Sequence, residues 1–342
     1  MQHLAPELVV HIFESLTSIS DIISLSLTCR YFHKLLTKSQ KLVLFFSAIE
    51  KEMGPLDEIL QLLTMNQNQI LHLRRTPPLS YALLSQVTTV GRVAHRFVSL
   101  YPAYRWTEAE SASRRLLDQC EARRLRRAVY RFWSYALAFH SKSYSLLRPD
   151  TTAAEERLQL LRSWTNDELF ELEDLRCTFE QLLASEICPT DGEVYSRIPE
   201  DARQSQRSMH HRLLPHLVGR MSTYQDVFHS SREPSVQDWN KASPQELRYK
   251  HMQGWGSDLQ NFYLVQSFLK FSPAQLLWLF DNAITKAEVE QFIESQTHDP
   301  CFFESGSLLF HDWVTVLHAR NVDVQQAREA IWDGKGGIVI EL

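Results

Sequence analysis

The chain has 342 residues, of which 44% are hydrophobic and 23% are charged, and its formal net charge is −5. This composition is typical of a globular chain of about two domains and excludes wholesale disorder. The mild acidity gives no general attraction to nucleic acid or anionic membranes, so neither is an expected partner. Ten glycines and 13 prolines fall below the usual share of roughly 12% of residues. Because strand-rich folds need these residues at turns, the predicted fold class is all-α.

The cysteines and the N-terminus predict the redox state of the thiols and the cellular location of the protein. The five cysteines form no Cys-x-x-Cys pair, which predicts reduced thiols and no disulfide framework. The start of the chain lacks a basic leader and a long apolar run. The longest apolar stretch, Leu42–Phe46, is far shorter than the roughly 20 residues of a membrane-spanning helix. We therefore expect a soluble protein in the cytoplasm, the nucleus or both, with no membrane partner.

The first 36 residues are predicted to form three short helices. On a helix over residues 7–16, five apolar side chains share one arc and the polar ones lie opposite. A break at residues 18–21 precedes a second predicted helix over 21–29 and a third over 30–36. Such a small unit cannot bury its own apolar faces. These faces are predicted to bind another protein or, alternatively, to extend a larger helical core.

The order of residues in this stretch resembles the F-box family. The family pattern has a Leu-Pro-x-Glu-Leu opening, an Ile-Phe-x-x-Leu continuation, an Asp-Leu step and a Cys-Arg-x-Phe/Trp close. The chain supplies matching residues in that order: Leu4, Pro6, Glu7, Leu8, Ile12, Phe13, Leu16, Asp21, Ile22, Leu25, Cys29, Arg30 and Phe32. It departs from the pattern where proline directly precedes the glutamate, which alters the entry turn.

The resemblance implies a trihelical F-box domain at residues 1–45 and a larger, irregular helical domain at residues 46–342. The F-box would dock on the Skp-type linker protein of cullin-RING ubiquitin ligases, and the helical domain would recognise a target protein of unknown identity. The implied linker-binding residues are Leu4, Pro6, Glu7, Leu8, Ile12, Phe13, Leu16, Ile22, Leu25, Cys29 and Phe32. The chain would be a non-catalytic substrate receptor without a cofactor, and cullin would be a partner through the linker. The alternative is a helical scaffold whose F-box-like start has no role in ubiquitin transfer.

Several patterns predict where helices start and where loops lie. Six capping boxes, in which a Ser or Thr and the third residue after it satisfy free backbone amides, begin at Thr107, Thr152, Thr165, Ser243, Ser272 and Thr285. Residues 74–80, 188–208 and 230–244 are predicted loops. Residues 334–342 are the best strand candidate, as a single extended segment packed on helices.

An arginine-rich stretch in the middle of the chain has three interpretations. Arg123, Arg124, Arg126, Arg127 and Arg131 share one face of a predicted helix. This face could bind phosphates of nucleic acid, or an acidic or phosphorylated target segment. It could instead pair with the acidic run Asp167–Asp174 of the same chain, which we favour because the whole chain is acidic.

The remaining patterns favour structure over chemistry. His210, His211 and His216 lack companion ligands at zinc-binding spacing. The segments His298–Cys301 and Gly334–Gly337 lack the rest of a catalytic or phosphate-binding motif. The aromatic clusters Trp255–Phe271 and Leu276–Phe280 could form a binding surface, but helical spacing favours the core. The sequence therefore predicts no metal site and no enzyme.

Overall fold

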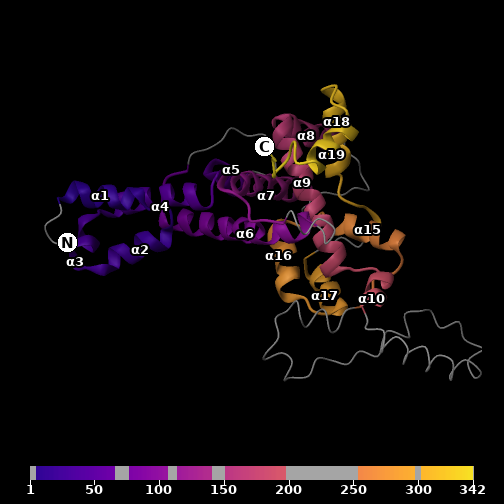
Figure 1. Cartoon of the computed structure of the whole chain (residues 1–342), viewed down its shortest axis with the longest axis horizontal. Helices are drawn as coiled ribbons and strands as arrows, with labels where there is room; N and C mark the ends of the chain where they lie inside the picture. Colours follow the sequence, from indigo (N-terminus) through magenta and orange to yellow (C-terminus); the bar gives the residue numbers. More distant parts are fainter. Residues whose placement is uncertain are drawn as a thin grey trace, which may run out of the picture. The chain divides into compact units, whose positions relative to one another are not determined.

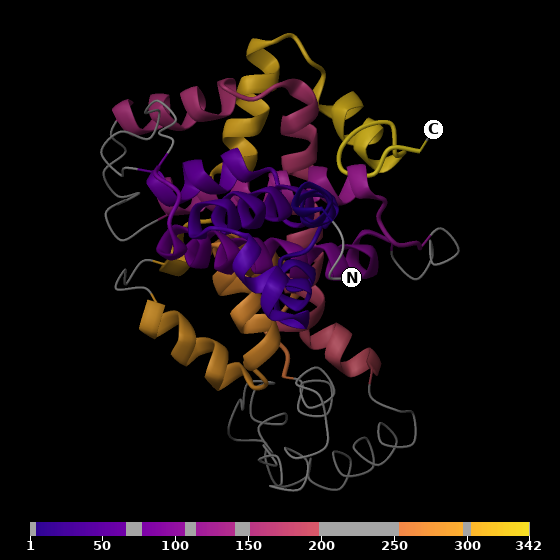
Figure 2. The same ribbon diagram turned by 90° about the vertical axis from the view of Figure 1, so that its left-hand side faces the viewer.

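The structure is a computed structural model that describes residues 5–65, 77–106, 114–140, 151–197, 253–296 and 302–341. These residues form helices and turns without any strand, which confirms the predicted all-α fold (Figures 1 and 2). The chain divides into two compact units. Unit 1 comprises Met1–Thr178, Ser272–Ala274 and Leu308–Leu342, and unit 2 comprises Phe179–Phe271 and Gln275–Ser307. Within the described part, every helix falls short of the length and apolarity needed to cross a membrane.

Unit 1 begins with the three predicted helices, α1 (Pro6–Ser15), α2 (Ile19–Thr28) and α3 (Arg30–Leu35), followed by a fourth, α4 (Lys38–Glu52). Its other helices are α5 (Leu56–Thr64), α6 (Tyr81–Arg105), α7 (Gln119–Phe139), α8 (Thr151–Arg162), α9 (Asn166–Leu182, which runs into unit 2), α18 (Leu309–Ala319) and α19 (Val324–Trp332). Figure 1 shows α1 to α3 gathered at one end of α4, while the other end of α4 leads into the body formed by α5 to α7. The boundary predicted after residue 45 would divide α4.

The body of unit 1 is built around α7. This helix packs against α5 and α6 and buries Leu125, Val129, Tyr130 and Phe132 almost completely. Helix α8 packs against α18, whose Trp313 donates its ring N–H to the Leu169 carbonyl at 2.9 Å. Because α7 is buried on most sides, its buried arginines, Arg126 and Arg131, need hydrogen-bond acceptors within the chain.

Unit 2 holds the aromatic clusters. After α9 the chain forms a π turn (Leu183–Ile187), α10 (Asp191–Arg197), α15 (Asp258–Phe268), α16 (Pro273–Asn282), α17 (Lys286–Gln296) and a 3-10 turn (Phe302–Glu304). Phe268 and Phe271 are buried, and the rings of Phe271 and Phe302 lie 5.0 Å apart. The core interpretation is therefore right for Phe268 and Phe271. It is wrong for the exposed side chains, which are Leu259, Phe262 and Tyr263 on α15 and Trp278 on α16.

The predicted helix starts and loops have mixed outcomes. The capping boxes at Thr165 and Thr285 form both reciprocal hydrogen bonds, and α16 begins at Pro273 directly after Ser272. Thr152 lies within α8, and the boxes at Thr107 and Ser243 lie outside the described residues. Residues 77–80 are non-helical as predicted. The loop over 188–208 is wrong in part because α10 occupies residues 191–197, and residues 230–244 are not described.

The C-terminal segment is not a strand. Gly334 and Gly337 adopt positive φ angles of 68° and 86°, and the Glu341 amide donates to the Gly334 carbonyl at 2.7 Å. The segment therefore closes on itself as a turn and buries Ile338 and Val339. The predicted strand failed because positive φ at two glycines turns the backbone away from an extended path.

Candidate partner-binding site

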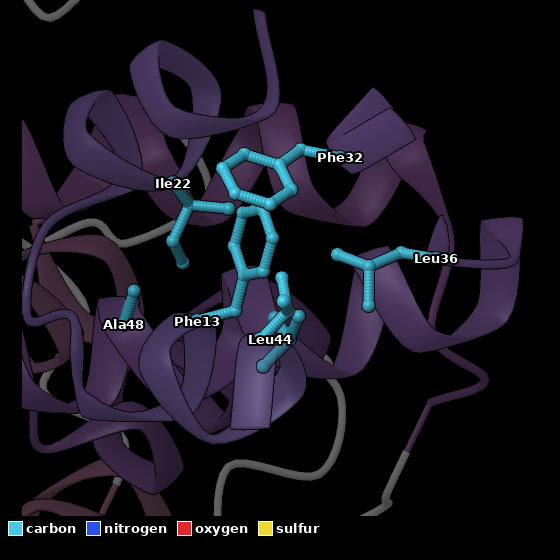
Figure 3. Packing of buried hydrophobic residues seen from close by; sticks show 7 residues of the cluster. Phe13, Ile22, Phe32, Leu36, Leu44 and Ala48 are labelled. Carbon is cyan, nitrogen blue, oxygen red and sulfur yellow. The ribbon is translucent and has the colours of Figure 1, made fainter. Parts of the chain in front are cut away.

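Helices α1 to α4 form a small unit, the N-terminal module, with its own apolar core. Its fully buried members come from all four helices: Val9, Phe13, Ile22, Phe32, Leu36, Leu44 and Ala48. The rings of Phe13 and Phe32 meet edge to face at 6.3 Å with an interplanar angle of 82° (Figure 3). Leu44 and Ala48 belong to α4, so the three predicted helices bury their inner faces only with the help of a fourth. The sequence interpretation missed this because it predicted three helices ending at residue 36 and no fourth helix in the F-box domain, whereas α4 begins at Lys38.

Local hydrogen bonds start each short helix of the module. Pro6 occupies the first turn of α1, where its missing N–H costs nothing. Ser18 accepts from the Ser20 amide at the start of α2, and the Cys29 sulfur accepts from the Phe32 amide at 3.5 Å at the start of α3. An oxygen cap such as Ser18 contributes about 1 kcal/mol, whereas the Cys29 sulfur is a weaker acceptor. These caps fix where α2 and α3 begin.

The structure divides the predicted linker-binding residues into three groups. Phe13, Ile22 and Phe32 are at most 3% exposed and form the interior of the module, so no partner can reach them while the module is folded. Partly exposed positions are Leu16, Leu25 and Cys29, and exposed positions are Pro6, Glu7, Leu8 and Ile12. Leu4 lies outside the described residues. The predicted arc on α1 is thus split between the core and the surface.

Five apolar side chains on α1 to α3 are exposed, two of which belong to the predicted set. Leu8 and Ile12 on α1 are 53% and 42% exposed, and Ile23 and Leu27 on α2 are 43% and 69% exposed. Tyr31 on α3 is 36% exposed. We call these five the outer apolar residues. Ile23, Leu27 and Tyr31 were missed because Ile22 and Leu25 were assigned in their place. The spacing of four between Ile23 and Leu27 on α2 was the signal that could have found these two. No helical spacing connects them to Tyr31, because the extended Cys29 separates α2 from α3.

The exposure of the outer apolar residues bears on whether the module binds a partner. Single exposed apolar side chains are ordinary on a protein surface. Here five are exposed on three helices of a module of fewer than 50 residues whose core is already filled. Removing such surface from water contributes roughly 25 cal/mol per Å², so the module can gain free energy by binding a partner with an apolar face.

The arginine-rich stretch lies on α7, and two of its arginines pair with the predicted acidic run on α9. Arg127 binds Glu171 through two nitrogens, one at 2.9 Å, and reaches Glu168 at 3.5 Å. Arg131 lies 2.7 Å from both Glu58 and Glu168. Burial raises the pKa of Glu168, but hydrogen bonds from Arg131 and the Thr165 amide outweigh it and lower the pKa to about 2. The intramolecular pairing favoured from sequence is present at these two positions.

The other three arginines bind elsewhere in unit 1. Arg124 and Arg126 donate through Nε to the carbonyls of Ile338 and Gly54, at 2.8 and 2.9 Å. Arg123 lies 2.6 Å from Glu50. The prediction that the whole face meets the acidic run is wrong for these three because successive positions on α7 point towards different neighbours. All five guanidinium groups have acceptors within the chain, and the Arg123 side chain remains 49% exposed.

The remaining sequence patterns lie outside the described residues or form no site within them. His210, His211 and His216 and the segment 298–301 lie outside the described residues. Among residues that are described, no group of three or more His, Cys, Asp or Glu side chains could hold a metal ion. Gly334–Gly337 forms the C-terminal turn and precedes no helix in the described part.

Comparison with known protein families gives one match. The model of the F-box-like family matches residues 1–42, which are α1 to α3 and the start of α4. No curated protein and no solved structure matches the chain. The match covers the helices that carry the outer apolar residues and ends at residue 42. The chain therefore carries an F-box-like domain at its N-terminus.

Proposed function

We propose that the chain is a non-catalytic adaptor that binds a Skp-type linker protein through its N-terminal module. The observation that carries this proposal is the exposure of the outer apolar residues on a module whose interior is already filled. An F-box-like match over the same helices supports it, because such domains typically bind linkers of this type. The linker would cover Leu8 and Ile12 on α1 and Ile23 and Leu27 on α2.

The finer part of the proposal is a role in ubiquitin transfer. The linker would connect the chain to a cullin, and the helical region after the module would hold a target protein. The contribution to chemistry is proximity, because a tethered target meets the charged conjugating enzyme at a high effective concentration. Such an adaptor would act in the cytoplasm, the nucleus or both. It requires no cofactor.

Co-purification tests the proposal. The chain is co-expressed with a Skp-type linker and a cullin and captured through a C-terminal tag. A complex of all three supports the ligase adaptor. Linker without cullin supports a scaffold that has no role in ubiquitin transfer, and capture of neither contradicts the proposal.

Target capture needs a second experiment. The chain and its Leu8→Asp, Ile12→Asp double variant are used as baits in cells with the proteasome inhibited. A target should bind both baits, because the variant alters only the module. Its ubiquitinated form should accumulate only with the unaltered chain. Equal ubiquitination with both baits would contradict the ligase role.

A further inference from the structure

Residues 50–54 join the N-terminal module to the body of unit 1. They are the last three residues of α4, which belong to the module, and the first two residues after it, which lead to α5. The helix continues without a break from the module core, where it contributes Leu44 and Ala48, to Ile49 and Met53, which are buried nearer its end. A continuous helix is a stiffer connection than a loop.

Two side chains within residues 50–54 bind the other helices of the module. The Lys51 ammonium donates to the carbonyls of Glu14 and Leu16 at 2.7 and 3.2 Å, which lie at the end of α1. The Glu52 carboxylate accepts from the Ile19 amide at 3.3 Å, at the start of α2. The end of α1 and the start of α2 are therefore both tied to the last turn of α4.

Three side chains of α7 bind the same residues 50–54. Arg126, which is 5% exposed, donates to the Gly54 carbonyl at 2.9 Å, and the buried Tyr130 hydroxyl donates to the Met53 carbonyl at 2.6 Å. Arg123 pairs with Glu50 at 2.6 Å, and Glu50 also accepts from the amide of Leu56 at 2.7 Å. Helix α6 adds a close packing contact, because a Cβ at Gly91 would lie 2.9 Å from Met53 Cβ.

We propose that residues 50–54 form a rigid joint that fixes the orientation of the N-terminal module relative to the body, and that Arg126 and Arg123 are positioning residues of this joint. This gives part of the arginine-rich stretch a role other than binding a partner. Arg126 is the stronger of the two because its bond is buried, whereas the Arg123–Glu50 pair is about half exposed and screened by water. The consequence for ubiquitin transfer, a fixed placement of linker relative to body, rests on the proposed function. The joint itself does not.

Distance measurements on the full chain test the joint. Nitroxide labels are introduced through a non-natural amino acid at two exposed positions, Ser24 on α2 and Arg92 on α6. Double electron–electron resonance then reports the distribution of module-to-body distances. The unaltered chain should give one narrow peak, and Arg126→Ala should broaden it towards additional distances.

Arg124→Ala is the matched control. Arg124 is also on α7 and also donates through Nε to a backbone carbonyl, at 2.8 Å, but to Ile338 in the C-terminal turn. It should leave the distribution as narrow as in the unaltered chain. Equal broadening by both variants would show a general loosening of the fold and would overturn the joint.

A second variant covers the case in which Arg126→Ala fails to fold. Arg126→Lys keeps the charge and most of the apolar stem but replaces the guanidinium, and should broaden the distribution while the circular dichroism stays native. An unchanged distribution in every folded Arg126 variant would overturn the proposal. Linker binding is measured on the same samples. If the unaltered chain does not bind the linker, the adaptor function is contradicted, but the joint between module and body is not.

Discussion

The Arg131 guanidinium lies 2.7 Å from the Glu168 carboxylate and 2.7 Å from that of Glu58, so one arginine on α7 holds α5 and α9 together. The side chains of Arg131 and Glu58 are only 6% and 8% exposed. A pair at this depth stabilises little relative to apolar residues, but removing one partner leaves a buried charge and is costly. The arrangement makes the helices of unit 1 depend on one another.

A double-mutant cycle should detect this dependence. Arg131→Met and Glu168→Gln should each lower the free energy of unfolding, and the double variant should lose less than the sum, with a coupling of roughly 0.5–3 kcal/mol. Chemical denaturation measures all four proteins. Arg126→Met with Glu168→Gln is the control and should be additive, because Arg126 binds Gly54 and shares no partner with Glu168. Additive losses in the Arg131 cycle would show that the pair is not coupled.

The buried carboxyl of Asp174 predicts an unusual pH dependence. It accepts hydrogen bonds from the Tyr101 hydroxyl and the Ile338 amide, and burial raises its pKa from 3.8 to about 6 despite the charge of Arg105. A raised folded pKa means that protonation favours the folded state. The stability from this group is fully present below its unfolded pKa, and is lost as the pH rises through about 6. The full effect is on the order of 3 kcal/mol.

Asp174→Asn isolates this contribution. Unfolding curves are recorded from pH 4 to pH 7 for both proteins, and the stability of the unaltered chain relative to the variant should fall across that interval. Glu168 does not interfere, because its pKa is lowered. The stability that Glu168 contributes to the fold is lost only as the pH falls from about 4.5 towards 2. A constant difference between the two proteins over pH 4–7 would mean that Asp174 titrates normally.

Core and surface positions of the N-terminal module should respond differently to truncation. Phe13→Ala removes a ring that is 0% exposed and should cost about 3–5 kcal/mol through lost burial and the cavity left behind. Leu8→Ala, on the same helix but 53% exposed, should change stability by no more than about 0.5 kcal/mol. Thermal and chemical unfolding measure both. A similar loss at the two positions would contradict the division of α1 into a buried and an outer face.

The C-terminal turn should not tolerate a side chain at Gly337. This residue has a φ of 86°, and a Cβ there would lie 2.8 Å from the Asp174 carboxylate. Gly337→Ala should therefore cost at least about 1–2 kcal/mol from the backbone conformation alone. Gly192→Ala in α10 is the control, since the nearest atom to its added Cβ is 3.8 Å away and alanine favours the helix. Hydrogen exchange of residues 334–341 should rise only in Gly337→Ala.

Shortened chains test where the module ends. A chain beginning at Thr37 keeps all of α4, including the Thr37–Gln40 capping box, and should fold cooperatively. A chain beginning at Phe46 cuts α4 in its middle and should be less stable, because Phe46 and Ile49 are buried and would belong to a frayed helix end. Equal thermal unfolding of the two chains would show that the first half of α4 serves the module alone.

In the N-terminal module, the helix positions could be predicted from the sequence but the buried residues could not. Helical periodicity and turn residues gave the positions of α1, α2 and α3 to within two residues. They could not separate Leu8 from Val9 or Ile22 from Ile23, because adjacent apolar residues both fit a broad arc and only the packing of α4 decides which one is buried. The polar start of α4 concealed it, since Lys38 and Lys41 are solvent-facing residues of a helix whose apolar positions come later.

The arginines show the same limit at longer range. Charge complementarity correctly paired Arg127 and Arg131 with the acidic run. Arg124 and Arg126 bind backbone carbonyls of Ile338 and Gly54, and no sequence pattern marks a carbonyl as an acceptor because every residue carries one. These partners could be found only once the tertiary structure was known.

Binding of a purified Skp-type linker by isothermal titration calorimetry tests the central claim most directly. The unaltered chain should bind, and Leu8→Asp with Ile12→Asp should weaken binding by at least about 100-fold, because each buried unpaired carboxylate costs several kcal/mol. Circular dichroism should stay native, as both positions are exposed. Leu116→Asp is the control, because Leu116 is 85% exposed and lies outside the module. The affinity of this variant for the linker should equal that of the unaltered chain. Equal affinity of the double variant and the unaltered chain would contradict the assignment of the outer apolar residues as the linker-binding surface.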